Sequence, residues 1–325
     1  MKLENIEINK IRDAAIKLID SDPFLAFKLF DLALKYRPMG PLLIDKYTLL
    51  KDQLDITTFI IIGNCQSDVI ADLIPLKNNK FYVIECIKAH EYTYDDSIIH
   101  RLDRTDYIIT QPISKLFKGI NTEELNKRYS SKMVVIPGVF FKGNHPDWFY
   151  PPKLPNGKRP QSATGPYHNQ TIFEAFNEGL SEEEALKRYL DVDFNQQKYI
   201  NVAEDSILEL RNREIKVDIK MSDIILNNFN DGVCDFHTIN HPKLSLMNEL
   251  VNKLLKHIKL NIQNLDTKGE ALDWIKLRTN PINKLINPNS IVVKDKEMSS
   301  LFFVKRSYEI YNKNASYFMK YNKIK

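Results

Sequence analysis

The segment that most constrains the fold is residues 57–62, an unbroken run of β-branched and aromatic side chains that ends in Gly63. Such a run is typical of a strand that is buried on both faces of a parallel sheet. Further short apolar runs follow at 81–87, 107–110 and 133–136, and polar or helical segments such as 122–129 separate them. This alternation predicts a helix-rich α/β fold with a small, mainly parallel sheet.

Helices are expected on both sides of this α/β region. In residues 4–54 apolar residues recur at helical spacing, and Asp22-Pro23 supplies a cap followed by a proline in the first turn. Residues 26–38 have the spacing of the second half of a tetratricopeptide (TPR) unit. Only one such unit is visible, whereas solenoids need about three, so a helical appendage is favoured over a peptide-binding array.

Three parts are therefore predicted. Residues 1–54 form the TPR-like N-terminal appendage, 55–260 the α/β catalytic domain, and 261–325 a helical C-terminal extension. A long loop at 143–166 interrupts the α/β domain, because six of the fifteen prolines and three of the ten glycines fall there. Helical spacing resumes after this loop at 169–178, 181–190 and 197–215, and most clearly at 243–258.

Composition narrows the range of functions. The 46 basic and 42 acidic residues give a net charge of +4, too small for a dedicated nucleic-acid binder. No apolar stretch approaches the ~18–20 residues that cross a bilayer, and the first residues lack the apolar core of a secretory signal. We therefore expect a cytoplasmic protein. The three cysteines form no CxxC pair, which indicates free thiols and no structural zinc.

Cys65 lies in the sequence Gly63-Asn64-Cys65-Gln66, where the predicted strand passes directly into a helix. Open α/β sheets place their ligands at this point. Unpaired N–H groups and the helix dipole stabilise a thiolate there, and they stabilise an oxyanion formed beside it. Asn64 and Gln66 bring amide donors, and Gln111, at the end of another strand, is a third candidate. Either Cys65 is a nucleophile, or it is an inert cysteine buried at a turn.

A second cluster precedes the predicted helix at 243–258 and contains Asp235, His237, Asn240 and His241. A histidine held at a helix entry suits a catalytic base, because its second ring nitrogen finds a carboxylate or carbonyl partner. Alternatively, one histidine caps the helix and the other is packed. The two histidines are spaced as metal ligands, but no third and fourth ligands accompany them, so no metal is expected.

Polar and aromatic residues lie at both ends of the 143–166 loop. His145 and Asp147 stand near its start, and Tyr167 and His168 follow its end. Such residues can clamp a nucleotide or a sugar, with aromatic rings that stack and polar groups that orient the ligand. A purely structural loop, pinned by its aromatic residues, explains the pattern equally well.

The C-terminal residues 305–325 are rich in tyrosine and carry six Lys or Arg against one Glu. Such a segment can contact anionic lipid or phosphate. The alternative is a helix that packs through its tyrosines and leaves its lysines in solvent.

Four motifs occur in a fixed order: GNCQ at 63–66, GNHPD at 143–147, GPYH at 165–168 and HxxNHP at 237–242. Together they resemble the WcbI family of capsular polysaccharide biosynthesis proteins over roughly residues 56–260. The sequence is also similar, more remotely, to SGNH hydrolases and acyltransferases, with Cys65 in place of their serine. That superfamily usually has Asp three residues before its histidine. Thr238 stands there in this chain, so Asp235 or a backbone carbonyl is expected to orient the base.

The resemblance implies an acetyltransferase that takes acetyl-coenzyme A as cosubstrate and acetylates a sugar hydroxyl of a capsule or surface polysaccharide precursor. Cys65 and His241 would act as nucleophile and base, with His237 and Asp235 beside them. The remaining candidates are Asn64, Gln66, Gln111 and Asn240 for the oxyanion or substrate, and Gly63, His145, Asp147, Tyr167 and His168 for the coenzyme.

Other functions remain open from the sequence. In a direct-transfer variant, His241 is the base and Cys65 only lines the pocket. An esterase or thioesterase would use the same pair with water in place of the sugar. A non-catalytic scaffold of a capsule assembly complex would instead use the N-terminal helices and the basic tail for docking, with the tail also available for peripheral membrane contact.

Overall fold

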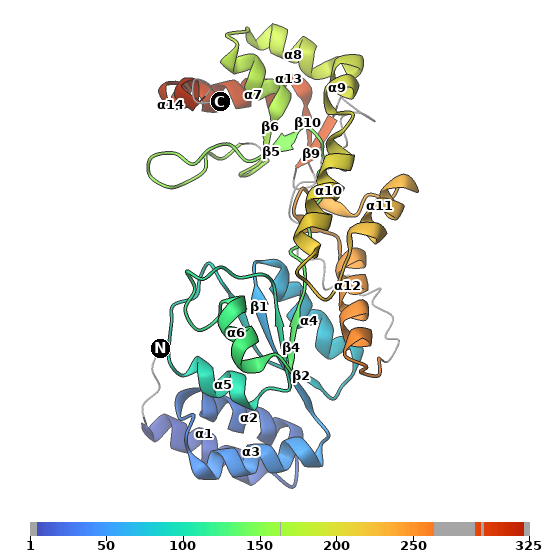
Figure 1. Ribbon diagram of the computed structural model, residues 1–325. Helices are drawn as coiled ribbons and strands as arrows, with labels where there is room; N and C mark the ends of the chain where they lie inside the picture. Colours follow the sequence, from blue (N-terminus) through green and yellow to red (C-terminus); the bar gives the residue numbers. More distant parts are fainter. Residues whose placement is uncertain (1–4, 163, 263–289, 294–295, 322–325) are drawn as a thin grey trace. The chain divides into compact units, whose positions relative to one another are not determined.

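The computed structural model describes residues 5–162, 164–262, 290–293 and 296–321 (Figure 1). Its contacts divide the chain into two compact units. The first contains Met1–Gly138, Lys216–Lys220 and Met247–Leu272, and the second contains Val139–Ile215, Met221–Leu246 and Asp273–Lys325. The boundaries expected from the sequence at residues 54 and 260 stay predictions.

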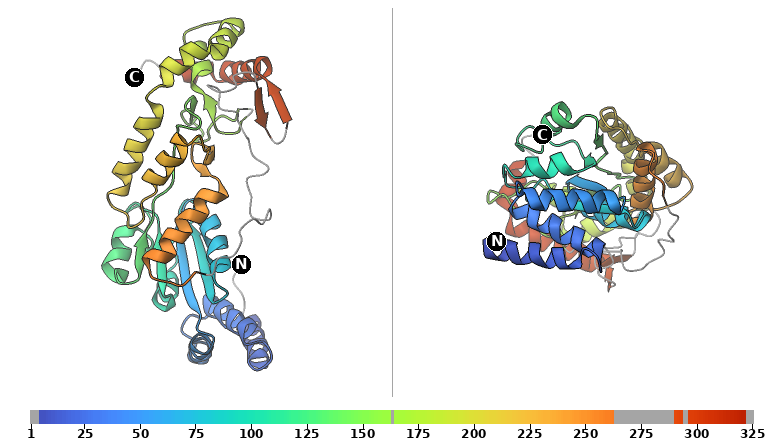
Figure 2. Two further views of the ribbon diagram at one scale, coloured as in Figure 1. Left: turned by 90° about the vertical axis from the view of Figure 1, so that its right-hand side faces the viewer. Right: turned by 90° about the horizontal axis from the view of Figure 1, so that it is seen from below.

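The first unit begins with three helices, α1 (Asn5–Leu18), α2 (Pro23–Tyr36) and α3 (Pro41–Gln53). They pack in pairs, α1 on α2 and α2 on α3 (Figures 1 and 2). The Asp22 side chain accepts a hydrogen bond from Leu25 N at 3.0 Å, which confirms the predicted cap of α2. The core of these helices includes Ile56 and Tyr82, so they cover the end of the sheet at which the strands begin.

Buried polar contacts also join α2 to the sheet. Asp31 Oδ1 accepts from the Arg104 guanidinium at 2.7 Å, and Asp31 Oδ2 accepts from the Tyr82 hydroxyl at 3.2 Å. Burial raises the pKa of Asp31, and Arg104 opposes this shift. Removing either partner would leave a buried carboxylate underpaired, which makes this contact costly to break.

The sheet of the first unit has four parallel strands in the order β2-β1-β3-β4. Their bounds are β1 (Thr57–Gly63), β2 (Phe81–Lys88), β3 (Tyr107–Thr110) and β4 (Met133–Val135). Helix α4 (Gln66–Lys77) packs on β1 and β2. Helices α5 (Ile98–Arg104) and α6 (Thr122–Tyr129) cover the face that presents Ile60, Ile62 and Ile108. The predicted α/β class and parallel sheet are confirmed.

The strand order reverses at β1, because β2 pairs with one edge of this strand and β3 with the other. In open α/β sheets the carboxyl ends of strands at such a reversal form a ligand-binding crevice. At this end of the sheet, β1 finishes with Gly63 and is followed by Asn64 and Cys65, and β3 is followed by Gln111. The topology therefore brings two sequence-predicted segments to one place within the first unit.

The exposed edge of β4 is covered by the segment Lys216–Lys220. Asp218 N donates to Val135 O at 2.8 Å, and Asp218 Oδ2 accepts from Val135 N at 2.7 Å. Val217 and Ile219 of the same segment are buried. An edge strand paired in this way does not offer free backbone groups to another chain.

The second unit is mainly helical (Figure 1). Its helices are α7 (Gln170–Asn177), α8 (Glu182–Leu190), α9 (Val192–Tyr199), α10 (Val202–Glu214), α11 (Ser222–Asn230), α13 (Ser300–Lys313) and α14 (Ala315–Tyr321). Helix α12 (Leu244–His257) begins in this unit and continues into the first.

Short antiparallel strand pairs accompany these helices. Strand β5 (Trp148–Phe149) pairs with β6 (His168–Asn169), β7 (Phe236–Thr238) with β8 (His241–Pro242), and β9 (Ser290–Val293) with β10 (Lys296–Ser299). The first pair closes the proline-rich loop at its base, and the second pair fixes the segment that contains the paired histidines.

The C-terminal helices are packed through their aromatic residues. Phe303, Tyr308 and Tyr311 of α13 and Phe318 of α14 share a core with α7 and α8. Tyr308 and Tyr311 are thus internal, while Lys305 and Arg306 are exposed. Lys323 and Lys325 of the predicted basic tail lie outside the described residues. Within the described residues, no helix has both the length and the apolar character that crossing a membrane requires.

Candidate functional site

The Cys65 turn lies at the carboxyl end of β1 and immediately before α4. The Asn64 side chain folds over this turn, because its Oδ1 accepts from Gln66 N at 2.8 Å while Asn64 O accepts from Ser67 N at 3.0 Å. Cys65 itself is half-buried, Asn64 is exposed and Gln66 is buried. Cys65 is thus the residue directly before α4, and its thiol lies at the helix amino end, where the helix dipole favours negative charge.

Gln111, which follows β3, braces this turn from the neighbouring strand. Its Oε1 accepts from Asn64 N at 2.8 Å, and its Nε2 donates to Gln66 Oε1 at 3.3 Å. A Cβ at Gly63 would lie 2.7 Å from Gln111 Oε1, so glycine is required for this close approach. The three candidate amides are therefore one connected network around Cys65.

The other two cysteines differ from Cys65 in their surroundings. Burial raises the pKa of Cys86, in β2, to about 12, so its thiol stays protonated at neutral pH. Cys234 is exposed, and its Sγ lies 3.3 Å from Phe236 O. Neither lies at the amino end of a helix.

In the second unit, His241 opens β8 and is buried. Its Nδ1 lies 2.7 Å from Thr238 Oγ1 and 2.8 Å from the Tyr167 hydroxyl. The Tyr167 hydroxyl donates to Asn240 Oδ1 at 2.6 Å, and Tyr150 donates to Tyr167 at 2.9 Å. Two side chains predicted for substrate and coenzyme, Asn240 and Tyr167, thus join the hydrogen bonds of the predicted base.

Thr238 stands three residues before His241 and contacts its imidazole. The β7–β8 pairing accounts for this, since Thr238 is the strand partner of His241. The contact with Tyr167 was not predictable from spacing, because 74 residues separate the two. The hydrogen bond from Tyr150 to Tyr167 was not predicted either. Its only signal in the sequence is the position of Tyr150 in an aromatic-rich part of the loop.

The Asp235 carboxylate accepts from Asn228 Nδ2 at 2.8 Å, and burial raises its pKa. Its backbone carbonyl accepts from Lys243 N at 2.7 Å, which holds the start of α12. His237 lies in β7 and is half-buried. The catalytic roles expected for Asp235 and His237 stay predictions.

The histidines of the loop motifs are internal. His145 Nε2 donates to Phe236 O at 3.0 Å, and burial lowers the pKa of His145 to about 4. His168 Nε2 donates to Pro160 O at 3.1 Å while its Nδ1 lies 3.0 Å from the Tyr311 hydroxyl, and burial lowers its pKa to about 4 as well. Both rings are therefore neutral at pH 7 and support the surrounding fold.

Asp147 is also buried, and its carboxylate accepts from Asn169 Nδ2 at 2.6 Å. The Asn169 side chain in turn caps α7 by accepting from Ile172 N. This links the GNHPD motif to the helix after the GPYH motif. The coenzyme-binding roles expected for Gly63, His145, Asp147, Tyr167 and His168 stay predictions.

Each unit has a cavity among the described residues, and motif residues line the cavity of the second unit. In the first unit, a cavity of about 740 Å³ begins at Pro112, next to Gln111, and is lined by hydroxyl, amide and charged residues that include Ser114, Lys115, Thr122, Asn126 and Lys216. In the second unit, a cavity of about 530 Å³ is lined by Gly143 and Pro146 of the GNHPD motif, together with Asp193, Gln196, Gln197 and Phe229.

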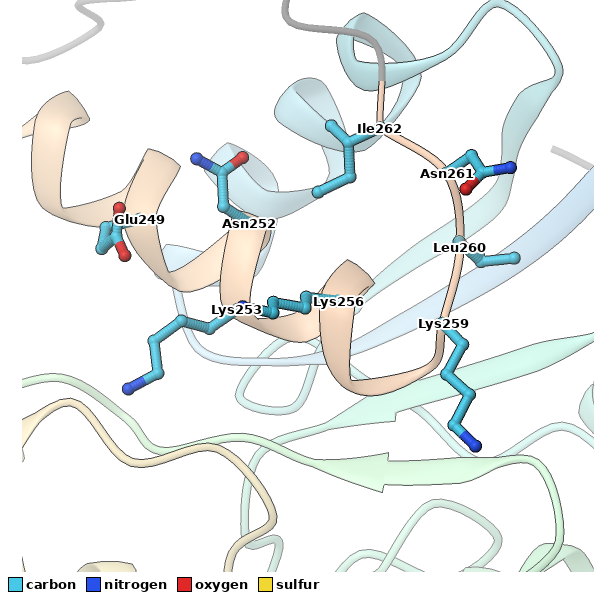
Figure 3. Close-up of a pocket in the computed structure, with 8 residues that line it drawn as sticks. All are labelled: Glu249, Asn252, Lys253, Lys256, Lys259, Leu260, Asn261 and Ile262. Carbon is cyan, nitrogen blue, oxygen red and sulfur yellow. The ribbon is translucent and has the colours of Figure 1, made fainter.

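A third pocket, of about 470 Å³, lies between the last turns of α12 and residues 259–262 (Figure 3). The Lys253 and Lys259 side chains point in different directions rather than toward one point (Figure 3). The Lys253 ammonium donates to Lys220 O at 2.7 Å. None of the four motifs lines this pocket, so it is not the candidate site. Among the described residues, no group of three His, Cys, Asp or Glu is arranged to hold a metal.

Comparison with known proteins agrees with the motif order. The chain matches the family model described as polysaccharide biosynthesis enzyme WcbI over residues 58–263. This range contains all four motifs, and it confirms the resemblance seen from the sequence. Searches of curated proteins and of solved structures gave no match. Since the family model spans well over half of the 325 residues, the chain belongs to the WcbI family of polysaccharide biosynthesis enzymes.

Proposed function

We propose that this enzyme transfers an acetyl group from acetyl-coenzyme A to a sugar hydroxyl of a capsule or surface polysaccharide precursor. The observation that carries the proposal is the Cys65 turn. A half-buried thiol stands at the amino end of α4, at the strand-order reversal of an open α/β sheet. The helix dipole lowers the cost of forming a thiolate there. The family's role in polysaccharide synthesis supports a sugar as the acceptor.

The proposed mechanism has two half-reactions. His241 takes the proton of the Cys65 thiol, the thiolate attacks the thioester carbonyl, and the coenzyme thiol leaves with that proton. A sugar hydroxyl then attacks the Cys65 acetyl thioester and gives its proton to His241, and the Cys65 thiolate is released and reprotonated. Tyr167 and Thr238 contact His241 at Nδ1. Nε2 is therefore the nitrogen that acts as the base.

The oxyanion of each tetrahedral intermediate needs preorganised donors. The amide network of Asn64, Gln66 and Gln111 is held in place by its own hydrogen bonds, which supports this role. The cavity that includes Pro112 is lined by hydroxyl, amide, lysine and carboxylate side chains, which suit a polar ligand such as a sugar.

The test uses a variant in which Cys65 is the sole cysteine, Cys86→Ala/Cys234→Ala. After incubation with acetyl-coenzyme A, mass spectrometry should find one acetyl group on a peptide containing Cys65. The matched control is the triple variant that also carries Cys65→Ala, which should remain unmodified. A folded Cys65→Ala enzyme that keeps the full transfer rate would contradict covalent catalysis and favour direct transfer.

Release of coenzyme thiol separates transfer from the other candidate functions. Transfer requires that release depend on an added sugar acceptor. Release that is unaffected by acceptor would indicate a thioesterase. No release with any acceptor, together with intact polysaccharide acetylation in cells carrying Cys65→Ala and His241→Ala, would indicate a scaffold.

A further inference from the structure

Two hydroxyl groups lie against Nδ1 of the His241 imidazole, and an amide lies behind them. Nδ1 lies 2.8 Å from the Tyr167 hydroxyl and 2.7 Å from Thr238 Oγ1. Behind them, Asn240 Oδ1 accepts from Tyr167 at 2.6 Å and lies 3.2 Å from the Tyr150 hydroxyl. Tyr167, Thr238 and His241 are all buried, so these hydrogen bonds form away from water and are correspondingly strong.

Counting the hydrogens of this cluster assigns the ring proton. A tyrosine hydroxyl has one hydrogen, and the short contact with the amide oxygen of Asn240 uses the hydrogen of Tyr167. The Tyr167 oxygen can then only accept from His241 Nδ1. Thr238 Oγ1 donates to the Tyr167 oxygen at 3.1 Å or to Asn240 Oδ1 at 3.3 Å, so it is likewise left to accept from Nδ1. The proton of a neutral His241 ring therefore sits on Nδ1, which leaves the lone pair on Nε2.

We propose that Tyr167, oriented by Asn240, is a positioning residue that holds His241 in the tautomer with its proton on Nδ1. Thr238 Oγ1 is the second oxygen atom that contacts Nδ1 of His241. This inference rests on the proposed function, because only a base acting through Nε2 requires that tautomer. When Nε2 takes a proton, Nδ1–H keeps its bond to the Tyr167 oxygen, and Tyr167 loses no proton.

The arrangement differs in charge from a triad with Asp, because every partner of Nδ1 named here is neutral. A carboxylate both orients the ring and stabilises the imidazolium, whereas a hydroxyl backed by an amide mainly orients it. Tyr167 was expected from the sequence to bind the coenzyme. The two roles predict different kinetics: loss of a coenzyme contact raises KM, whereas loss of a positioning contact lowers kcat.

The decisive measurement reads the ring directly and needs no substrate. In protein labelled with ¹⁵N-histidine, NMR correlations of the ring protons distinguish Nδ1–H from Nε2–H. The His241 signals are identified by their absence in His241→Gln. We expect Nδ1–H in the parent enzyme and a shift toward Nε2–H in Tyr167→Phe/Thr238→Val. Tyr150→Phe is the matched control and should keep Nδ1–H.

A parent enzyme with its His241 proton on Nε2 would overturn the proposal, as would a folded Tyr167→Phe/Thr238→Val variant that keeps Nδ1–H. The single variants Tyr167→Phe and Thr238→Val give the same readout if the double variant does not fold. In activity, Tyr167→Phe should lower kcat about ten- to hundredfold with little change in KM for acetyl-coenzyme A. A rise in KM with unchanged kcat would favour coenzyme binding instead.

Asn240→Asp places a carboxylate behind Tyr167. Because a negative charge behind Tyr167 favours the protonated ring, the acidic limb of the pH–rate profile should move to higher pH. An unmoved limb would contradict the chain of contacts from Asn240 to His241. If no acetyl transfer is found but the tautomer is as expected, the proposed function fails and the assignment of the ring proton stands.

Discussion

Gln111 accepts a hydrogen bond from the backbone N–H of Asn64 at 2.8 Å, although 47 residues separate the two. This contact joins the end of β3 to the turn after β1, and Cys65 is the next residue of that turn. The position of the thiol therefore depends on a neighbouring strand as well as on its own helix.

Replacing Gln111 should loosen this turn. In Gln111→Leu, the Asn64 N–H loses its acceptor in a part-buried site, which costs about 1 kcal/mol. We expect a lower free energy of unfolding in urea and a transfer rate reduced at least tenfold. Gln53→Leu, a change at an exposed site at the end of α3, is the control and should alter neither quantity. Equal rates for Gln111→Leu and the parent would show that the brace does not matter for catalysis.

Gly63→Ala, at the end of β1, tests the close approach between residue 63 and the Gln111 side chain. The added Cβ would lie 2.7 Å from Gln111 Oε1, so one of the two groups must move. We expect a loss of about 1–3 kcal/mol in stability, because overpacking a buried site forces neighbours out of position. Combining Gly63→Ala with Gln111→Ala should recover part of this loss, because the second change removes Gln111 Oε1, the atom that the new Cβ would clash with. Strict additivity of the two losses in a double-mutant cycle would argue against the clash.

The three cysteines should differ in reactivity. Burial raises the pKa of Cys86 to about 12, so at pH 7–8 almost none of it is thiolate. Alkylation with iodoacetamide, followed by peptide mass mapping, should modify Cys65 and the exposed Cys234 well before Cys86. Denatured protein is the control, in which all three should react alike. Preferential labelling of Cys86 in the folded protein would contradict the described environment.

Two buried histidines make stability depend on pH. Burial lowers the pKa of His145 and of His168 from 6.5 to about 4. Between these two pH values, both histidines are protonated in the unfolded chain and neutral in the folded chain. Stability is therefore full above about pH 6.5 and falls as the pH drops toward 4. Each histidine contributes up to about 3 kcal/mol to this fall. Urea unfolding at pH 7 and pH 5 measures it.

His168→Gln should reduce the pH 7 to pH 5 difference in unfolding free energy by about half. His90→Gln is the control, because the His90 side chain is 60% exposed, and this change should leave the difference as it was. The raised pKa of Asp31 acts in the opposite direction, but it is common to all variants and cancels in the comparison. An unchanged difference in His168→Gln would contradict the neutral, buried ring.

Much of the first unit follows from local patterns. Strand β3 has the predicted bounds, and so has helix α6, because each is a short run whose ends are marked by polar residues. The start of α2 was predictable from Asp22-Pro23, whose chemistry is local. The position of Cys65 at a strand-to-helix turn follows in the same way from residues 57–66.

Features that depend on distant pairing were not predictable. The expected helix over 197–215 is two helices, α9 and α10, separated at Ile200-Asn201, and apolar spacing runs through the break without marking it. The β7–β8 pair is too short for a period-two pattern to show. The hydroxyl groups at His241 Nδ1 needed three-dimensional information, because Tyr167 and Thr238 are brought together only by folding.

The contacts of Asp31 bear on how this enzyme can be shortened. The family match begins at residue 58, yet the sheet there rests on Phe27 and Phe30 and on a carboxylate supplied by α2. A fragment trimmed to the matched region would expose Tyr82 and leave the Arg104 cation without its counter-ion. An expressed fragment should therefore retain helices α1–α3, because α2 completes the core and the ion pair on which the sheet packs.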